Sequence, residues 1–249
     1  MIEQHSTSAE PARQARPEPG VRPALSVPFF EIGPKNVLRR PELHQLLAAA
    51  QLHSRRLGVS VIATLPVTEI EPAALLFPDL HLFAQHMDPD RPGKSVGRVI
   101  AEALADAGAS GVMLNHADHP MRLDDVAVAV ERARSNGLTS LVCAADEPAA
   151  AAVAALSPDI LLYEPRALIG HGGGAQRPWI PRINALVRAI GPRTLIMHAG
   201  GVATPEDARD LVRAGAAGTG ATSAIINARD RGKVVEGFLS AVRQAQDGT

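Results

Sequence analysis

The sequence predicts a single α/β domain in which eight parallel strands and their helices close into a (β/α)₈ barrel. Short apolar runs alternate along the chain with longer amphipathic stretches. The runs are continuously apolar, which is typical of parallel strands whose faces are covered by other elements. The chain has 249 residues, and single barrels of this type typically have about 250. An open, doubly wound sheet is the alternative on pattern alone.

The eight expected strands are short apolar segments. In chain order they are Ser26–Ile32, Val59–Leu65, Leu80–Ala84, Gly111–Leu114, Leu138–Cys143, Ile160–Tyr163, Thr194–His198 and Gly218–Thr222. The last is the weakest of the eight, because Gly218 and Gly220 lower its strand propensity.

Helices with clear end signals separate these segments. The segment from Pro41 to Leu57 repeats apolar residues at helical spacing, and Gly58 supplies a C-terminal stop. A second helix is expected from about Pro205 to Ala214, because Thr204 offers a capping hydroxyl directly before a proline at the first helical position.

Charge and composition restrict the partners and the compartment. The formal net charge is −1 and no long basic run is present, so we expect neither a nucleic-acid nor a membrane partner. Cys143 is the only cysteine, and no apolar segment is long enough for a membrane span or a signal sequence, so we expect a cytoplasmic protein. Residues 1–22 are polar and proline-rich and are expected to form a disordered tail, which leaves residues 23–249 for the barrel.

The reactive groups of such barrels lie in the loops that follow the strands. His116 follows the fourth expected strand and Glu164 follows the sixth. Each alone is more often an ordinary hydrogen-bonded or solvated side chain, but together at one mouth they can act as electrophile and base on neighbouring carbon atoms. The glycines Gly170, Gly200 and Gly201 form either tight turns or a nest of N–H groups for an anion.

Several motifs lie in order along the predicted barrel. They are Ala84-Gln85-His86-Met87-Asp88-Pro89, Pro92-Gly93-Lys94-Ser95-Val96-Gly97, Leu114-Asn115-His116, Val142-Cys143, Ala155-Leu156-Ser157-Pro158-Asp159, and Glu164-Pro165 with Ile169-Gly170. Together they resemble the archaeal-style branch of the triosephosphate isomerase family. The resemblance covers about residues 26–242, essentially the whole barrel.

This resemblance implies a TIM barrel and an aldose–ketose isomerase that acts on a short sugar phosphate through an enediolate, with no cofactor and no metal. In the family's known mechanism, Glu164 would be the base that moves a proton between two carbons, and His116 the neutral imidazole that polarises the substrate oxygens. The segment from Pro165 to Gln176 corresponds to a lid that closes over the substrate.

The resemblance also implies a phosphate site and an assembly. The residues that would donate backbone N–H groups to the phosphate are Gly170, Gly200, Gly201 and Ser223. The segment from about His86 to Gly97 corresponds to a loop that contacts a neighbouring subunit, so we expect a homodimer or homotetramer.

The first strand departs from the family pattern. Where the family has Asn-x-Lys, this chain has Glu31-Ile32-Gly33, so Glu31 replaces the asparagine and Gly33 the catalytic lysine. Lys35 lies two residues further on, beyond Pro34, and rescues the site only if its ammonium reaches the mouth. We therefore expect poor turnover of triose phosphate itself.

Further departures surround the same pocket, and they keep other functions open. They are Ala117-Asp118 for the usual Ser-Glu, Val96 for a threonine, and Gly170-His171-Gly172 for Gly-Thr-Gly. One alternative is a changed chemistry, an epimerase or lyase, in which Glu31 and Glu164 both transfer protons. Another is a barrel that binds a ligand without catalysis. A Schiff-base aldolase is disfavoured, because no lysine lies within an apolar strand.

A metal centre is a weaker alternative. Histidines and carboxylates gather in two loops, but without a tight ligand spacing such groups usually form ordinary polar networks. The side chains concerned are His86, Asp88, Asp90, His116, Asp118 and His119.

Overall fold

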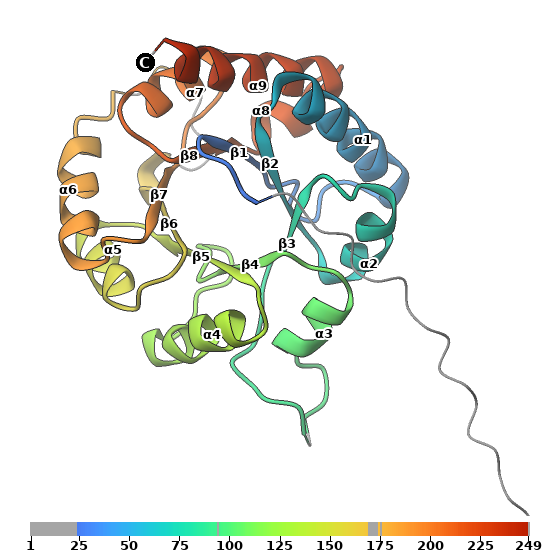
Figure 1. Ribbon diagram of the computed structural model, residues 1–249, viewed down its shortest axis with the longest axis vertical. Coiled ribbons are helices and arrows are strands. Elements are labelled where there is room, and N and C mark those ends of the chain that lie inside the picture. Colours follow the sequence, from blue (N-terminus) through green and yellow to red (C-terminus); the bar gives the residue numbers. More distant parts are fainter. Residues whose placement is uncertain (1–23, 94, 169–173, 175, 249) are drawn as a thin grey trace, which may run out of the picture.

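The computed structural model describes residues 24–93, 95–168, 174 and 176–248. Eight parallel strands form a closed barrel in which each strand pairs with the next and β8 pairs with β1 (Figure 1). The strands are β1 (Phe29–Ile32), β2 (Ser60–Leu65), β3 (His81–Ala84), β4 (Gly111–Leu114), β5 (Thr139–Ala144), β6 (Ile160–Tyr163), β7 (Leu195–His198) and β8 (Gly218–Ala221). The predicted single barrel is therefore confirmed, and the expected tail, residues 1–22, lies outside the described residues.

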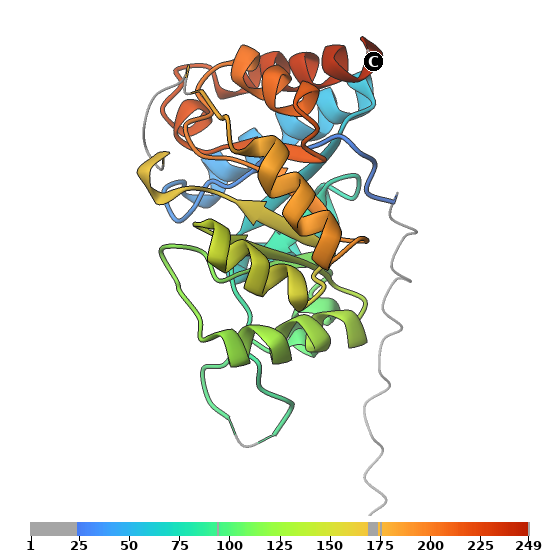
Figure 2. The same ribbon diagram turned by 90° about the vertical axis from the view of Figure 1, so that its left-hand side faces the viewer.

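Helices surround the barrel in both views (Figures 1 and 2). They are α1 (Arg40–Leu57), α2 (Val67–Leu76), α3 (Ala101–Asp106), α4 (Leu123–Ser135), α5 (Glu147–Ala155), α6 (Ile180–Ile190), α7 (Pro205–Arg213), α8 (Ser223–Ile226) and α9 (Arg231–Asp247), with a 3₁₀ turn η1 (Arg166–Leu168) after β6. Within the described ranges, no helix is long and apolar enough to cross a bilayer.

The predicted helix ends are present. Gly58 takes a left-handed conformation with a φ of 66° and donates its N–H to the carbonyl of Ser54, which ends α1. At the start of α7 the Thr204 hydroxyl accepts the N–H of Asp207, and the Asp207 carboxylate accepts the N–H of Thr204.

The strand bounds agree to within one residue with those expected from the sequence, except at the start of β1. We expected this strand from Ser26, but it begins at Phe29. Pro28 has no N–H to donate to a ladder, and the Ser26 N–H bonds instead to the side-chain oxygen of Ser60, 3.0 Å away.

Two apolar layers follow from the alternation of side chains along each strand. Phe30 and Ile32 face outward into the layer between barrel and helices, while Phe29 belongs to the cluster inside the barrel. The glycines of β8 are explained by this interior, because a Cβ atom at Gly218 would overlap the ring of Phe29. The low strand propensity of β8 is thus offset by the large side chain that its glycines admit.

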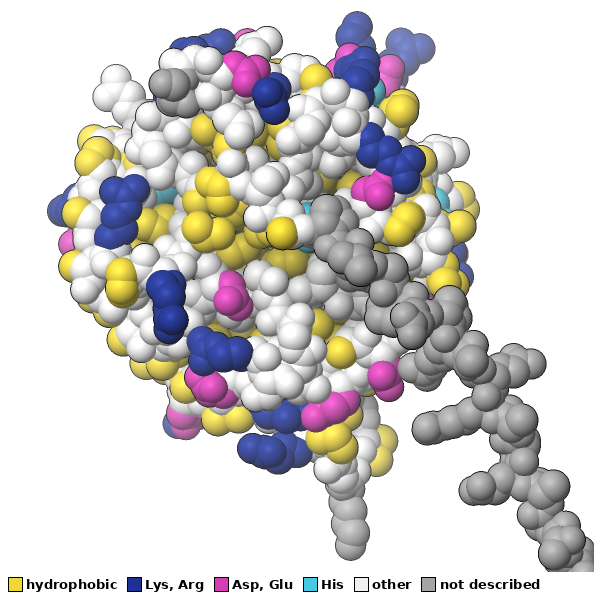
Figure 3. Space-filling model, in the orientation of Figure 1, with side chains coloured by type: hydrophobic (Ala, Val, Ile, Leu, Met, Phe, Trp, Pro, Cys, Tyr) yellow, Lys and Arg dark blue, Asp and Glu magenta, His cyan; other side chains and the backbone are white. Residues whose placement is uncertain are grey.

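Two surface features are visible directly. The segment between β3 and α3 projects away from the body of the barrel in both ribbon views (Figures 1 and 2). On the face drawn in Figure 3, basic and acidic side chains are interspersed, with no large patch of one sign.

Candidate active site

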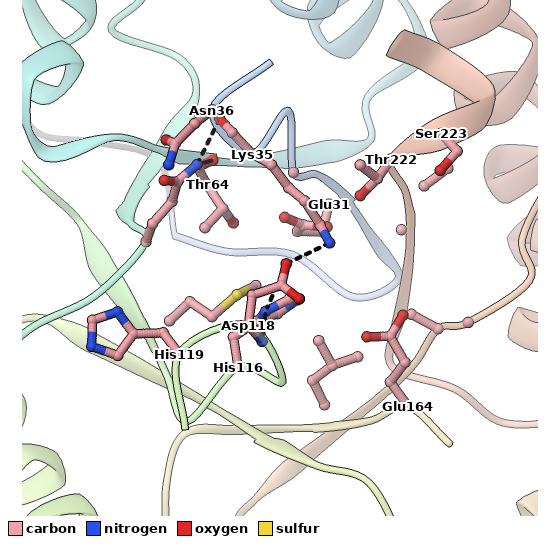
Figure 4. A pocket seen from close by; sticks show the side chains of 18 of the residues that line it. Glu31, Lys35, Asn36, Thr64, His116, Asp118, His119, Glu164, Thr222 and Ser223 are labelled. Atoms are coloured by element: carbon pink, nitrogen blue, oxygen red, sulfur yellow. Dashed lines mark hydrogen bonds and ion pairs between the residues drawn. The ribbon is translucent and has the colours of Figure 1, made fainter. Parts of the chain in front are cut away.

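The ends of the strands surround a cavity of about 660 Å³. Side chains from loops far apart in the sequence converge on it (Figure 4). Of the predicted site residues, those that line the cavity are Glu31, Lys35, His116, Glu164, Gly200, Gly201 and Ser223. Gly170 lies outside the described residues. The structure thus brings seven of the eight together, while the role of each stays a prediction.

His116 is held by the loop that follows β4. Asn115 takes a left-handed φ of 57°, and its side chain joins the loop to the barrel by donating to the Cys143 carbonyl (3.0 Å) and accepting the Met121 N–H (3.0 Å). His116 Nδ1 accepts the backbone N–H of Asp118 at 3.0 Å. An acceptor at Nδ1 assigns the proton of the neutral ring to Nε2.

The charge state of His116 follows from its surroundings. Burial lowers the pKa of the imidazole, and the Lys35 ammonium lowers it further, while the Asp118 carboxylate opposes both. The Asp118 carboxylate is 3.7 Å from Nδ1, which is too long for a hydrogen bond. The ring is therefore neutral at physiological pH, with a donor at Nε2.

Glu164 directly follows β6 and continues its pairing, because its N–H bonds to the carbonyl of Ala144 at 2.9 Å. Its side chain passes close to Gly200, where an added Cβ would lie 3.3 Å from the Glu164 Cγ. Burial raises the pKa of the Glu164 carboxyl, while the Lys35 charge opposes this shift and the Asp118 charge adds to it. A carboxylate of raised pKa is a stronger base for removing a proton from carbon.

Lys35 reaches the mouth. The residue takes a left-handed φ of 49°, and its carbonyl accepts a hydrogen bond from Gln85 Nε2 at 2.9 Å. Its Nζ lies 2.7 Å from Asp118 Oδ2 (Figure 4). The ammonium influences His116 and Glu164 as well, so one positive charge acts on both sides of the cavity.

Glu31 lies on the cavity wall contributed by β1. Only 5% of the residue is exposed, and the carboxyl occupies the space left by two glycines, since a Cβ at Gly33 would lie 2.8 Å from its Oε1 and a Cβ at Gly220 2.7 Å from its Oε2. Burial raises the pKa of Glu31 to about 7; the Thr64 side chain opposes the shift and the Glu164 charge adds to it. Both protonation states are therefore available near neutral pH.

Arg177 supports the glycine turn after β7. Gly200 and Gly201 have φ values of 89° and 64°, a conformation that favours glycine. Arg177 Nη2 donates to the carbonyls of both glycines, at 3.2 and 3.1 Å. Because the N–H of a trans peptide points away from its C=O, the next N–H groups along the turn point away from Arg177. Arg177 also lies 3.6 Å from the buried carboxylate of Asp207.

The histidines and carboxylates considered as metal ligands form a polar network at the rim. The rings of His86 and His119 stack with centroids 3.9 Å apart, and Asp88 accepts hydrogen bonds from Arg98 Nη1 and the Val99 N–H. Across the described part of the chain, no group of three or more His, Cys, Asp or Glu side chains is arranged to hold a metal ion.

The fold and this cavity define a (β/α)₈-barrel protein with acid–base side chains at the carboxyl ends of its strands. Comparison with known proteins gives the family: residues 35–242 match the model of the triosephosphate isomerase family. The chain belongs to that family. The match begins at Lys35, so β1 with Glu31 lies outside it.

Individual proteins similar to this chain carry the name of the same family. The triosephosphate isomerase of Sulfurisphaera tokodaii is 33% identical over 198 residues, 78% of this chain and 85% of the relative. That of Sulfolobus acidocaldarius is 35% identical over 196 residues, with the same coverage. The crystal structure of triosephosphate isomerase from Bartonella henselae superposes with a TM-score of 0.70 at 19% identity, covering 87% of this chain and 99% of that one. This last likeness concerns the fold.

Several contributors to the cavity were missed from the sequence. The sequence indicated Asp118 as a departure from the family pattern and as a possible metal ligand, but not as the partner of Lys35, which lies 83 positions away in the chain. Thr64, which lies beside Glu31, is in no motif that distinguishes it from an ordinary strand residue. The same holds for Arg177, which supports the glycine turn from a loop. Their significance follows from tertiary contacts alone.

Proposed function

We propose that the protein is an aldose–ketose isomerase that converts a short sugar phosphate through an enediolate. The observation that carries this proposal is that a neutral imidazole with its donor at Nε2 and a buried carboxylate of raised pKa line the same cavity. Membership of the triosephosphate isomerase family supports it.

Each group has one task in this reaction. Glu164 removes the proton from the carbon next to the substrate carbonyl and returns it to the neighbouring carbon. His116 donates the Nε2 proton in a hydrogen bond to the oxygens, where negative charge develops. A neutral donor suits this task because it stabilises the enediolate without handing it a proton from an imidazolium.

The phosphate is assigned to the side of the cavity opposite β4. Gly200 and Gly201 line the cavity there, and so does Ser223 at the start of α8. Their backbone N–H groups supply the kind of donors that bind phosphate oxygens. Gly170 completes the same set by resemblance.

Lys35 supplies the positive charge in place of the absent strand lysine. Its ammonium is paired with Asp118, and Glu31 adds a carboxyl to the same cavity. Both features weaken the attraction for a dianionic ligand relative to an unpaired lysine. We therefore propose that triose phosphates are turned over slowly and that a related short sugar phosphate is the better substrate.

Kinetics with a panel of three- to five-carbon aldose and ketose phosphates test the proposal. Glu164→Gln keeps the shape of the side chain and removes the base, so conversion of the best substrate should fall by at least about 10²-fold, the usual scale of general-base catalysis. Lack of conversion of every member by the wild type, with unimpaired binding, would indicate the non-catalytic alternative.

A second candidate is an epimerase or lyase, favoured by the two carboxyls of raised pKa on one cavity. Product analysis separates the two functions. Aldose–ketose interconversion supports the isomerase, whereas inversion at one carbon or cleavage of the substrate supports the changed chemistry.

The projecting segment between β3 and α3 is our proposed contact with a second subunit in a homodimer or homotetramer. Val96 in this segment is 99% exposed in the single chain. An apolar side chain at the tip of a projecting loop is well suited to burial against a neighbour.

A further inference from the structure

The proposed isomerisation needs two proton movements. One proton moves between carbons, which is the task of Glu164. A second must move between the two oxygens, because the carbonyl oxygen of the substrate becomes a hydroxyl in the product and the hydroxyl becomes a carbonyl. The described cavity offers His116 and Glu31 as candidates for this second transfer.

His116 is poorly suited to carry that proton. Its Nδ1 is occupied by the N–H of Asp118, so the ring exchanges a proton at Nε2 alone. Giving up this proton would leave an imidazolate anion, and Nε2 takes no second proton while it holds the first. The ring is thus suited to donating a hydrogen bond without transferring the proton.

Glu31 is better suited, because a carboxyl can give up a proton and take one back without forming an unstable ion. Its Oε1 is buried and, among the described residues, makes no hydrogen bond of normal distance and angle, although the Thr64 side chain acts on the carboxyl and the Glu31 side chain lines the cavity. The ammonium of Lys35, which lines the same cavity, is engaged with Asp118. Figure 4 shows Glu31, His116 and Glu164 on different sides of one opening. A buried carboxyl with an unused oxygen is costly for the fold, which favours a functional role.

We propose that Glu31 is a catalytic residue that carries the proton between the two substrate oxygens. This inference rests on the proposed isomerase function. Glu164 takes the carbon-bound proton, which leaves the enediolate stabilised by His116, and the protonated Glu31 then gives its proton to the former carbonyl oxygen, which forms the enediol. The Glu31 carboxylate then takes the proton of the other hydroxyl as that oxygen becomes the new carbonyl, and Glu164 returns its proton to the first oxygen's carbon. Glu31 ends protonated, as it began.

The surroundings of Glu31 suit this cycle. Glu164 acts on it from the position directly after β6, Thr64 from β2 and Cys143 from β5, while Lys35 lines the same cavity. Burial raises the pKa of the Cys143 thiol well above its usual value, so this neighbour stays uncharged. Acid and carboxylate forms of Glu31 are both populated near pH 7, as a group that alternately gives and takes a proton requires.

Proton exchange in deuterated water separates this role from a structural one. With the best substrate of the panel, one measures both the rate of conversion and the rate at which deuterium enters the starting substrate at carbon. Enediolate formation by Glu164, stabilised by His116, suffices for carbon exchange, whereas conversion also needs the oxygen-to-oxygen transfer. Glu31→Gln should lower conversion by at least about 10²-fold and leave carbon exchange within a few-fold of the wild type.

Two further variants complete the experiment. Glu164→Gln should lose exchange and conversion together, and Glu31→Asp, which keeps a carboxyl, should recover part of the conversion. Thermal unfolding verifies that each variant is folded. An unchanged ratio of exchange to conversion in Glu31→Gln overturns the assignment of Glu31 while leaving the isomerase intact. A wild type with neither exchange nor conversion across the panel overturns the isomerase proposal and this inference with it.

Discussion

Glu31→Gln should stabilise the protein, and the gain should grow with pH. Burial raises the pKa of this carboxyl from 4.5 to about 7. Between these values the folded protein keeps a proton that the unfolded chain has released, so the folded state binds more protons and stability falls as pH rises. At 1.36 kcal/mol for each pH unit, the full cost is about 3 kcal/mol above pH 7 and close to zero below pH 4.5. Glutamine does not ionise and avoids this cost.

Urea unfolding of wild type and Glu31→Gln at pH 4.5, 6 and 8, at one protein concentration, measures the effect. The advantage of the variant should increase by about 3 kcal/mol from the lowest to the highest pH. Glu71→Gln removes the same charge from an exposed position on α2 and should show no such trend. An advantage of Glu31→Gln that is equal at all three pH values would refute the reasoning, because it would mean that Glu31 ionises as readily in the folded protein as in the unfolded chain.

Three further perturbations test the remaining contacts. Lys35→Met should lower kcat/KM by about 10²–10³-fold with little change in Tm, because its pair with Asp118 is largely exposed; equal turnover by both proteins would contradict the role of this charge. Arg177→Met leaves the buried Asp207 without its cation and should lower the free energy of unfolding by about 3 kcal/mol. It should also weaken inhibition by inorganic phosphate in competition with the substrate. Arg182→Met, which breaks an exposed ion pair on α6, should have neither effect. Light scattering should give a mass of at least twice the 26.1 kDa of one chain, and Val96→Asp should reduce it to the monomer value; a monomeric wild type would remove the assembly proposal.

The barrel fold and many of the residues that line its cavity could be predicted from the sequence. Apolar runs predicted the strands and their bounds, Gly58 predicted the end of α1, and Thr204 predicted the start of α7. Each of these signals lies in residues that are close together in the chain. Because parallel strands of a closed barrel all end on one face, the position of His116 and Glu164 after their strands was enough to predict that they share a cavity.

The protonation and the orientation of the side chains in the cavity depend on the tertiary structure. Whether Lys35 reaches the mouth depends on a left-handed backbone at that residue, held by Gln85 from β3's end, and on Asp118 as its partner from the loop after β4. Glu31 could be placed on the inner face of β1 by alternation, but its raised pKa arises from burial against β8. Desolvation and Coulomb interactions depend on distances in space between residues that are far apart in the chain, and no local pattern of residues encodes those distances.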